Sequence, residues 1–400
     1  MREVVIAGAV RTAIGKFGGT LADVPATELG AAVVKEAMKR ACVAPEEVDE
    51  VIMGQVLQAG AGLNPARQVV LRSGLPVSVP AYTVNKVCAS GMKAVTLGAL
   101  SIVSGENEIV VVGGMENMSA APFLLQKARW GYRLGDGELL DGLLRDALQD
   151  PTEGCHMGIT AENLAAAFRI SRREQDEFAA HSQQKAAAAM EVGRFEPEIA
   201  PVEVPQKKGE LLLFRSDEFP RPDTTAEVLS TLKPAFKKDG TVTAGNASGI
   251  NDGAAAMVLL STEDAERRGI QPMAKIVSTA SAGVEPARMG LGPVPATKMA
   301  LDKAGLNLRD IEVVELNEAF AAQSLAVIAQ LGLAPGIVNL NGGAIALGHP
   351  VGASGARILV TLLYIMADRG ARLGLATLCV GGGQGMAMVV SNTRNCLTFS

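Results

Sequence analysis

The sequence contains little of what a metal-binding, disulfide-linked or nucleic-acid-binding protein needs. It has three histidines, and its five cysteines are scattered without Cys-x-x-Cys spacing. This pattern argues against a structural zinc site and against a disulfide framework. With one tryptophan, three tyrosines and no long basic run, the chain also lacks the usual signature of nucleic-acid binding. We therefore predict no bound metal and no nucleic-acid partner.

Signals for secretion or membrane insertion are also missing. Residues 1–10 run directly into a strand pattern, without the basic and then apolar order of a signal peptide. The longest apolar run near the carboxyl end, residues 358–367, is too short to cross a bilayer. These features predict a soluble, cytoplasmic protein with no membrane partner.

What the sequence does have is enough apolar material for a large core. Its 400 residues exceed the usual size of one domain, so two packed units are expected. Hydrophobic residues make up 48% and charged residues only 20%, which suggests surface hidden between domains or subunits. Because the net charge is −5, a polyanionic ligand would need a local positive site.

An internal repeat indicates the architecture. Residues 37–51 align without gaps on residues 300–314, and the segment ASGMKAV from Ala89 matches ASGARIL from Ala353. Residues 108–114 and 373–383 are both apolar strand patterns that end in glycines. Because these matches occur in the same order, we interpret the chain as a duplication.

Each repeat alternates buried strands with helical periodicity, which is typical of a mostly parallel sheet covered on both faces. The helices that open at the two ASG segments are apolar nearly all round, so they are expected between two sheets. The predicted fold is therefore a duplicated five-layer αβαβα arrangement. We predict an amino-terminal half at residues 1–120 plus 250–271, an inserted loop domain at 121–249, and a carboxyl-terminal half at 272–400.

Cys88 is the first candidate for chemistry. A buried cysteine is usually an inert core residue, but Cys88 lies at the predicted start of a buried helix. The partial positive charge of a helix start lowers a thiol pKa and favours the nucleophilic thiolate. The small residues Ala89, Ser90 and Gly91 would let a substrate approach closely.

Three further candidates lie in the second repeat. His349 precedes the equivalent helix, so it could meet Cys88 between the halves and form an activated thiol–imidazole pair. Cys379 ends an apolar strand before Gly381–Gly383, whose backbone N–H groups are accessible as an oxyanion site requires. Asn317 closes another strand, where it is either a ligand-site residue or a helix N-cap.

Seven segments together resemble the thiolase family along residues 1–390. They are NKVCASGMKAV, GGMENMS, HMGITAEN, AGNASGINDGAA, NEAFAAQ, NGGAIALGHPVGASGAR and CVGGGQG, in that order. The resemblance is closest to the branch that condenses two acetyl-CoA molecules. It implies a reversible, ping-pong formation of acetoacetyl-CoA and CoA through an acetyl-cysteine. It also implies that no cofactor is needed, and that subunits assemble as dimers or tetramers, here a homotetramer.

The resemblance also implies a role for each matching residue. Cys88 matches the acylated nucleophile, His349 the base that activates it, and Cys379 the acid/base that acts on the acetyl methyl group. Asn317 matches a residue that holds a water in one oxyanion hole with His349, and the N–H groups of Cys88 and Gly381 match the other. Residues that match coenzyme A contacts or the acyl pocket are His156, Met157, Arg221, Ser248, Met289 and Phe320.

Alternative functions remain at this point. A 3-ketoacyl-CoA thiolase of β-oxidation would share these residues and accept longer chains. A non-catalytic acyl-CoA-binding protein would lack one of the three catalytic positions, all of which are present. A decarboxylating ketoacyl synthase would pair its cysteine with two histidines, whereas Cys379 stands at the third position here.

Overall fold

The sequence repeat becomes two copies of one strand-and-helix unit in the computed structural model, which describes residues 2–206 and 209–393. Cys396 lies outside the described residues. The first unit consists of β1 (Val4–Thr12), α1 (Ala26–Ala41), β3 (Glu50–Gly54), α2 (Pro65–Ser73), β4 (Ala81–Val84), α3 (Ser90–Ser104), β5 (Ile109–Asn117) and β11 (Asn251–Ser261). The second consists of β12 (Ala274–Gly283), α8 (Pro293–Ala304), β13 (Val313–Leu316), α9 (Ala321–Leu331), α11 (Val351–Arg369), β14 (Leu373–Val380) and β15 (Gln384–Asn392).

The strands of the two units form one sheet rather than two separate ones. Its order is β13-β14-β15-β12-β1-β11-β5-β3-β4. The units join where β1 pairs antiparallel with β12, at Val5 with Lys275 and Ile6 with Ala274. In the second unit the counterpart of β4 is reduced to a single parallel bridge between Val338 and Val314. The predicted duplication is therefore visible in the topology, with one strand lost.

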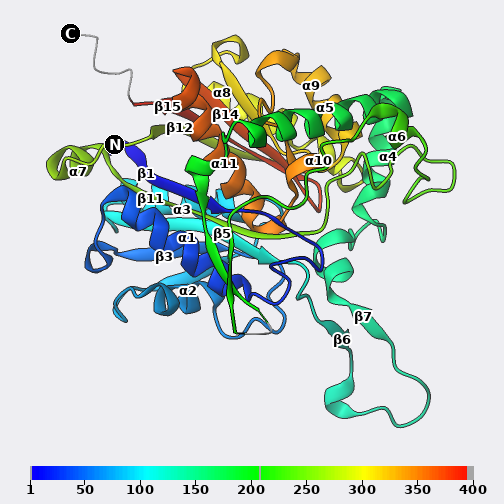
Figure 1. Ribbon diagram of the computed structural model, residues 1–400, viewed down its shortest axis with the longest axis horizontal. Coiled ribbons are helices and arrows are strands. Elements are labelled where there is room, and N and C mark those ends of the chain that lie inside the picture. The colour runs from blue at the N-terminus through cyan, green and yellow to red at the C-terminus, as the bar shows by residue number, and fades with distance from the viewer. Residues whose placement is uncertain (1, 207–208, 394–400) are drawn as a thin grey trace.

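Five layers result, as predicted, because each strand alternates its side chains between two helix layers. On β5, Val110 and Val112 pack in a core with α3 and α11, while Val111 and Met115 pack in a core with α1 and α2. The second unit packs its outer face against α8 and α9. Figure 1 shows α3 and α11 in the middle, α1 and α2 on one side, and α8 and α9 on the other.

Among the described residues, two helices could span a membrane by length and composition alone, and they are the two central helices. These spans are Val87–Ser104 and Val351–Arg369, of which 56% and 83% are buried inside the protein. Their apolar surface is thus covered by the two ends of the sheet, as expected for a helix that is apolar all round.

Glycines allow α3 and α11 to approach each other closely. A Cβ atom on Gly91 would lie 2.8 Å from the Ala356 nitrogen, and one on Gly355 would lie 2.7 Å from the Met92 nitrogen. No Cβ fits at such distances, so side chains at these two positions would force the helices apart. The starts of α3 and α11 are consequently held together at the centre of the molecule.

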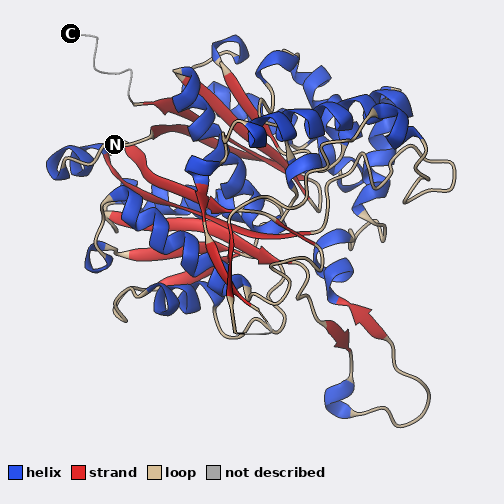
Figure 2. Ribbon diagram, in the orientation of Figure 1, coloured by secondary structure: helices blue, strands red, loops and turns tan. Residues whose placement is uncertain are grey.

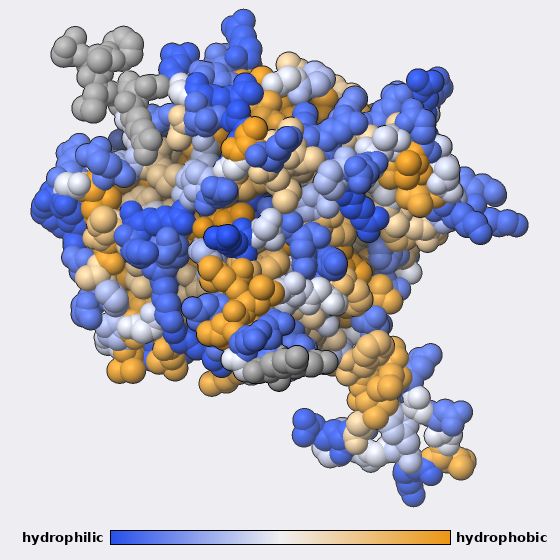
Figure 3. Space-filling model, in the orientation of Figure 1, coloured by the Kyte–Doolittle hydropathy of each residue, from blue (hydrophilic) through white to orange (hydrophobic). Residues whose placement is uncertain are grey.

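The segment between β5 and β11 forms a cap and a long hairpin. The cap holds α4 (Met157–Phe168), α5 (Arg172–Glu191) and α6 (Ala226–Ser230), whereas the paired strands β9 (Val202–Pro205) and β10 (Leu211–Phe214) pack against the core of the first unit. Before it, β6 (Phe123–Leu125) pairs with β7 (Leu139–Asp141) in a hairpin that projects from the body (Figure 2). Hydrophobic side chains gather at the base of this hairpin (Figure 3).

We expect Gly91→Ala to destabilise the protein by about 1–3 kcal/mol, because the added methyl group overpacks the contact between α3 and α11. Thermal unfolding followed by circular dichroism would measure the loss. Gly336→Ala is the matched control, since nothing lies within 4 Å of a Cβ atom there. Equal melting temperatures for the two variants would contradict the proposed tightness of the helix contact.

Candidate active site

Cys88 and His349 occupy the same position relative to the two central helices. Helix α3 has Ala89 as its N-cap and α11 has Pro350, so each candidate residue lies one position before the cap. In the sequence repeat Ala89 pairs with Ala353, but α11 begins at Val351, almost one turn earlier than α3. Val351, in the first turn of α11, packs in one cluster with Cys88.

A pocket of about 370 Å³ opens beside these two helix starts. The predicted site residues that line it are Cys88, His156, Met157, Arg221, Ser248, Met289, Phe320, His349, Cys379 and Gly381. Asn317 does not line this pocket and lies buried behind it. The structure therefore brings together side chains from both halves and from the inserted cap.

The turn that carries Cys88 before α3 contains a strained residue, Val87. Val87 has φ +47°, which is an unusual backbone angle for a β-branched residue and costs of order 1–3 kcal/mol. The Lys86 N–H donates to the Ser90 hydroxyl oxygen at 2.8 Å, and that hydroxyl donates to the Val87 carbonyl at 2.6 Å. These bonds fix the turn and direct the Cys88 side chain into the pocket.

The expected low pKa of Cys88 is wrong for the free protein. Burial raises the pKa of this thiol to about 11, although backbone N–H groups of Gly381 and of Cys88 itself hydrogen-bond to the sulfur and favour its thiolate. Helix starts favour negative charge, but here the loss of hydration outweighs that effect. The thiol must therefore lose its proton to a base during reaction.

The His349 ring lines the same pocket as Cys88 and is held by Ser354. The Ser354 hydroxyl donates to the Pro350 carbonyl at 2.8 Å, so it must accept from His349 Nδ1, which lies 2.5 Å away. This tautomer leaves Nε2 without a proton. Burial, together with the charge of Arg357, lowers the pKa of His349 to about 3, so the imidazole is neutral at rest.

A second contact holds the His349 backbone. The Asn251 side-chain oxygen accepts from the His349 N–H at 2.9 Å, while its amide donates to the Gly15 carbonyl at 3.0 Å. Asn251 begins β11, in the other half of the molecule. The histidine is therefore positioned from both halves.

Cys379 and Asn317 end neighbouring parallel strands, β14 and β13. Cys379 is fully buried, and burial and the nearby Cys88 raise its pKa above the ordinary thiol value. Both side-chain polar atoms of Asn317 are buried with no hydrogen-bond partner among the described residues. The alternative of Asn317 as a helix N-cap is wrong, because α9 begins at Ala321 with Phe320 in the cap position.

The pocket walls are apolar on two sides. Met157, Met289 and Phe320 pack in one cluster with Cys379. Met118, Leu148 and Val351 pack with Cys88 on the other side. Such walls exclude water from the sulfur atoms and limit the size of the group beside them.

The mouth of the pocket is built by the cap. His156 caps α4, where its Nδ1 accepts from the Gly158 N–H at 3.0 Å, and its ring stacks on Phe236 at 4.5 Å between centroids. Burial lowers the pKa of His156, which keeps this ring neutral. Arg221 is exposed, with its guanidinium 5.9 Å from the Phe219 ring centroid, and supplies a positive charge at the entrance.

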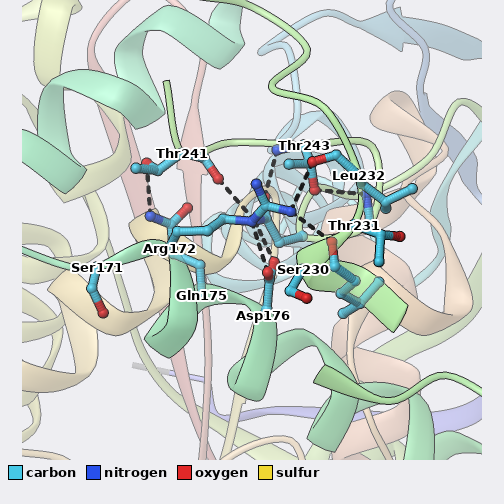
Figure 4. A network of polar contacts seen from close by, with 12 residues as sticks. Ser171, Arg172, Gln175, Asp176, Ser230, Thr231, Leu232, Thr241 and Thr243 are labelled. Atoms are coloured by element: carbon cyan, nitrogen blue, oxygen red, sulfur yellow. Dashed lines mark hydrogen bonds and ion pairs between the residues drawn. The ribbon is translucent and has the colours of Figure 1, made fainter. Parts of the chain in front are cut away.

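An adjoining pocket of about 430 Å³ shares Phe219, Arg221 and Ala244 with the first. A polar network stabilises its wall (Figure 4). Arg172 donates to Asp176 at 2.7 Å and to the Leu229 carbonyl at 2.6 Å, which ties α5 to α6. The two pockets therefore adjoin at these three residues, and the one lined by Cys88 lies next to the one under the cap.

Sequence reasoning missed the residues that position the predicted ones. Ser354, Asn251 and the strained Val87 were not candidates, because nothing in the sequence shows which distant groups meet. The sequence did offer a reason to consider Ser354, because it lies five residues after His349 in the segment GHPVGASG and could therefore reach the histidine. Glu116 was also missed, although it lies within the segment GGMENMS.

The fold and the pocket define a duplicated α/β protein in which Cys88 and His349 line one pocket between the halves. The family model for the N-terminal domain of thiolase matches residues 4–263, and that for the C-terminal domain matches residues 270–392. The chain therefore belongs to the thiolase family.

Its relatives extend over nearly the whole chain. Acetyl-CoA acetyltransferase of Escherichia coli is 60% identical, with 98% of this chain and 99% of that protein covered. The acetyl-CoA acetyltransferase of Pseudomonas aeruginosa is 58% identical, with 98% and 100% covered.

Solved structures are similar as well. The Bacillus anthracis acetyl-CoA acetyltransferase has a TM-score of 0.96 and 47% identity, with 98% of this chain and 99% of that chain covered. Human mitochondrial 3-ketoacyl-CoA thiolase in complex with CoA has a TM-score of 0.94 and 45% identity, with 98% of each chain covered.

Proposed function

We propose that the protein is an acetyl-CoA C-acetyltransferase, which converts two acetyl-CoA molecules reversibly into acetoacetyl-CoA and CoA. The observation that supports this most strongly is the convergence of Cys88, His349 and Cys379 on one apolar pocket. The relatives named above, at 58–60% identity over nearly their full length, support the same activity.

In the first half-reaction, the Cys88 sulfur attacks the thioester carbonyl carbon while His349 Nε2 takes the thiol proton. The carbon–sulfur bond to CoA then breaks, and the CoA thiolate receives that proton and leaves. The N–H groups of Cys88 and Gly381 lie at the Cys88 sulfur, and they would donate to the carbonyl oxygen of the acyl group that bonds to this sulfur as that oxygen gains negative charge. The product is acetyl-Cys88.

In the second half-reaction, the Cys379 thiol gives its proton to His349, and the resulting thiolate removes a proton from the methyl group of a second acetyl-CoA. This carbon is a weak acid, so the enolate oxygen requires its own stabilisation. A water held by Asn317, with His349, would supply it, and the unpartnered Asn317 amide fits that role. The carbanion attacks acetyl-Cys88, acetoacetyl-CoA forms, and the departing Cys88 thiolate takes the proton held by His349, which restores the resting site.

Coenzyme A would extend through the two adjoining pockets. Its pantetheine arm would pass Ser248 and the stacked His156 and Phe236, and Arg221 would face its anionic nucleotide end. Val228 lies in the second pocket, where thiolases often have serine, so this chain lacks one hydroxyl contact there. Neither half-reaction changes an oxidation state, so we propose that no cofactor takes part.

A thiolysis assay tests the substrate. We expect acetoacetyl-CoA to be cleaved at least 10-fold faster than 3-ketoacyl-CoA substrates with eight or more acyl carbons, because Met289 and Phe320 close the apolar wall beside Cys379. Initial rates with CoA as the second substrate measure this ratio. Faster cleavage of the longer substrates would assign the protein to β-oxidation instead.

Separate roles for the two cysteines can be tested by substitution. Cys379→Ser should still accept an acetyl group on Cys88 from radioactive acetyl-CoA, but condensation should slow by about 10²-fold or more, because a hydroxyl is a poor base for a carbon acid. Cys88→Ala should abolish both steps. A folded Cys379→Ser variant that condensed at the wild-type rate would disprove the role of Cys379.

We also propose a cytoplasmic homotetramer. The chemistry needs Cys88 and Cys379 as free thiols, which a reducing compartment maintains. The edge strand β4 is a surface on which a second subunit can pair. The projecting hairpin exposes Phe123, Leu125 and Leu139 to the extent of 63%, 45% and 65%, which favours a contact between two dimers.

Light scattering should give about four times the chain mass of 41.4 kDa. Leu125 and Leu139 are paired across the hairpin, so Leu125→Lys with Leu139→Lys should reduce the particle to a dimer by placing charges in the contact. Val192→Lys, at an exposed valine on the cap, is the control and should leave the mass unchanged. A monomeric wild-type protein would exclude the tetramer.

A further inference from the structure

Glu116 is a buried carboxylate between the two halves of the molecule. It lies in β5 on the same face as Gly114 and is fully buried. Its Oε2 atom accepts from the Val56 N–H at 3.0 Å and from the Gly352 N–H at 2.9 Å, while Oε1 accepts from the Leu57 N–H at 3.2 Å. A single side chain thus joins the segment after β3 to the start of α11.

The contact with Gly352 replaces a missing cap. Helix α11 has no side-chain cap at Pro350, so the N–H groups of its first turn need other partners. Glu116 supplies a charged acceptor to one of them from the opposite half, which also suits the dipole of the helix. A Cβ atom at residue 352 would lie 2.6 Å from Glu116 Oε2 and 2.8 Å from the Met115 carbonyl oxygen, and the backbone contact in particular requires glycine there.

The site just described depends on this helix start. His349 lies two residues before α11, and Val351 lines the pocket beside Cys88. No side chain of the N-terminal half other than those of Glu116 and Asn251 hydrogen-bonds to the backbone at residues 349–352 in the described part of the chain. Loss of either bond would let the helix start move relative to Cys88.

The charged surroundings of Glu116 are simple. Asp252 of β11 is a like charge near Glu116, but it pairs with Asn117 and so belongs to the opposite face of the sheet, where the N–H and hydroxyl of Ser119 hold its carboxylate at 3.0 and 2.6 Å. Cys88, before α3, is the other titratable group that senses its charge, while the segment after β3 and α11 present backbone N–H groups. Burial raises the pKa of Glu116 to about 7, because its effect is larger than that of the three backbone N–H groups, whose hydrogen bonds lower the pKa.

We propose that Glu116 is a positioning residue for the transfer reaction: its carboxylate holds the start of α11, and with it His349, against the half that carries Cys88. This inference rests on the proposed acetyl transfer. Glu116 lies outside the pocket lining and does not touch the reacting atoms. It acts through the placement of His349 and through its charge near the Cys88 sulfur.

Glu116→Gln tests the proposal with little change in size. One amide N–H of the glutamine would face a backbone N–H, so at least one of the three hydrogen bonds from Val56, Leu57 and Gly352 would be lost. We expect kcat for acetoacetyl-CoA thiolysis to fall about 10- to 100-fold, because small displacements of a base cost rates of this order. KM should change less than about 3-fold, since the residues proposed to hold coenzyme A are elsewhere.

A second readout separates positioning from general destabilisation. The Glu116 anion raises the pKa of Cys88, so its removal should lower that pKa. The pH dependence of Cys88 alkylation by iodoacetamide, followed by peptide mass spectrometry, should therefore shift to lower pH in Glu116→Gln while turnover falls. A variant that is only less stable would show a lower melting temperature and an unshifted profile.

Two further variants complete the test. Glu116→Asp keeps the negative charge, but its shorter side chain cannot hold all three backbone N–H groups. We therefore expect kcat to fall without a shift of the alkylation profile. This variant also tests the proposal if Glu116→Gln does not fold. Asp49→Asn is the control, because Asp49 accepts the N–H groups of Glu108 and Ile109 at the opposite end of β3 and β5. It should retain wild-type kcat.

Wild-type kcat in folded Glu116→Gln and Glu116→Asp, or an unshifted alkylation profile in Glu116→Gln, would overturn the positioning role. An inactive wild-type protein would instead contradict the proposed acetyl transfer, and the alkylation profile would still show whether the Glu116 charge acts on Cys88.

Discussion

The close contact between the starts of α3 and α11 is the constraint on which the rest of the structure depends. Gly91 and Gly355 allow the two buried helices to touch, and Gly352 leaves room for the Glu116 carboxylate. Because Cys88 and His349 each precede one of these helices, the same contact brings a thiol and an imidazole into one pocket. The packing contact between α3 and α11 therefore also places the side chains of the candidate site.

Burial gives this site its chemical character. It raises the pKa of Cys88 and lowers that of His349, so the free site holds a neutral thiol and a neutral base. Charge appears only during reaction, where fixed N–H groups and a low-polarity environment stabilise it more than water would. The strained Val87 and the unpartnered, buried Asn317 amide are both unfavourable in an ordinary core. Features of this kind gather at functional sites, which agrees with the position of these two residues beside the pocket.

Much of the fold follows from patterns in the sequence. The repeat and the apolar central helices predict two similar units with helices between sheet layers, and the described structure has this arrangement. Local patterns could not show that β1 and β12 join the units into one sheet, because two pairs of residues make that contact. Nor could they show that α11 starts almost one turn earlier than α3, since proline and glycine around His349 are compatible with several starting points.

The candidate site is predictable where its residues stand at the ends of strands and the starts of helices. Cys88, His349 and Cys379 could be proposed for that reason and through the family resemblance. Ser354, Asn251 and Glu116 could not, because their roles arise from contacts between distant segments. Glu116 meets Gly352 across 236 residues, and Asn251 meets His349 across 98. The pKa of Cys88 was wrongly expected to be low because its depth of burial is a tertiary property.

The most direct test of the account is a crystal structure of the protein after exposure to acetyl-CoA. The account predicts an acetyl group on the Cys88 sulfur, with its carbonyl oxygen at the N–H groups of Cys88 and Gly381 and with His349 Nε2 facing the sulfur. An acetyl group on another residue, or acetyl-Cys88 with His349 turned away from it, would contradict the central claim that the α3–α11 contact assembles the reacting pair.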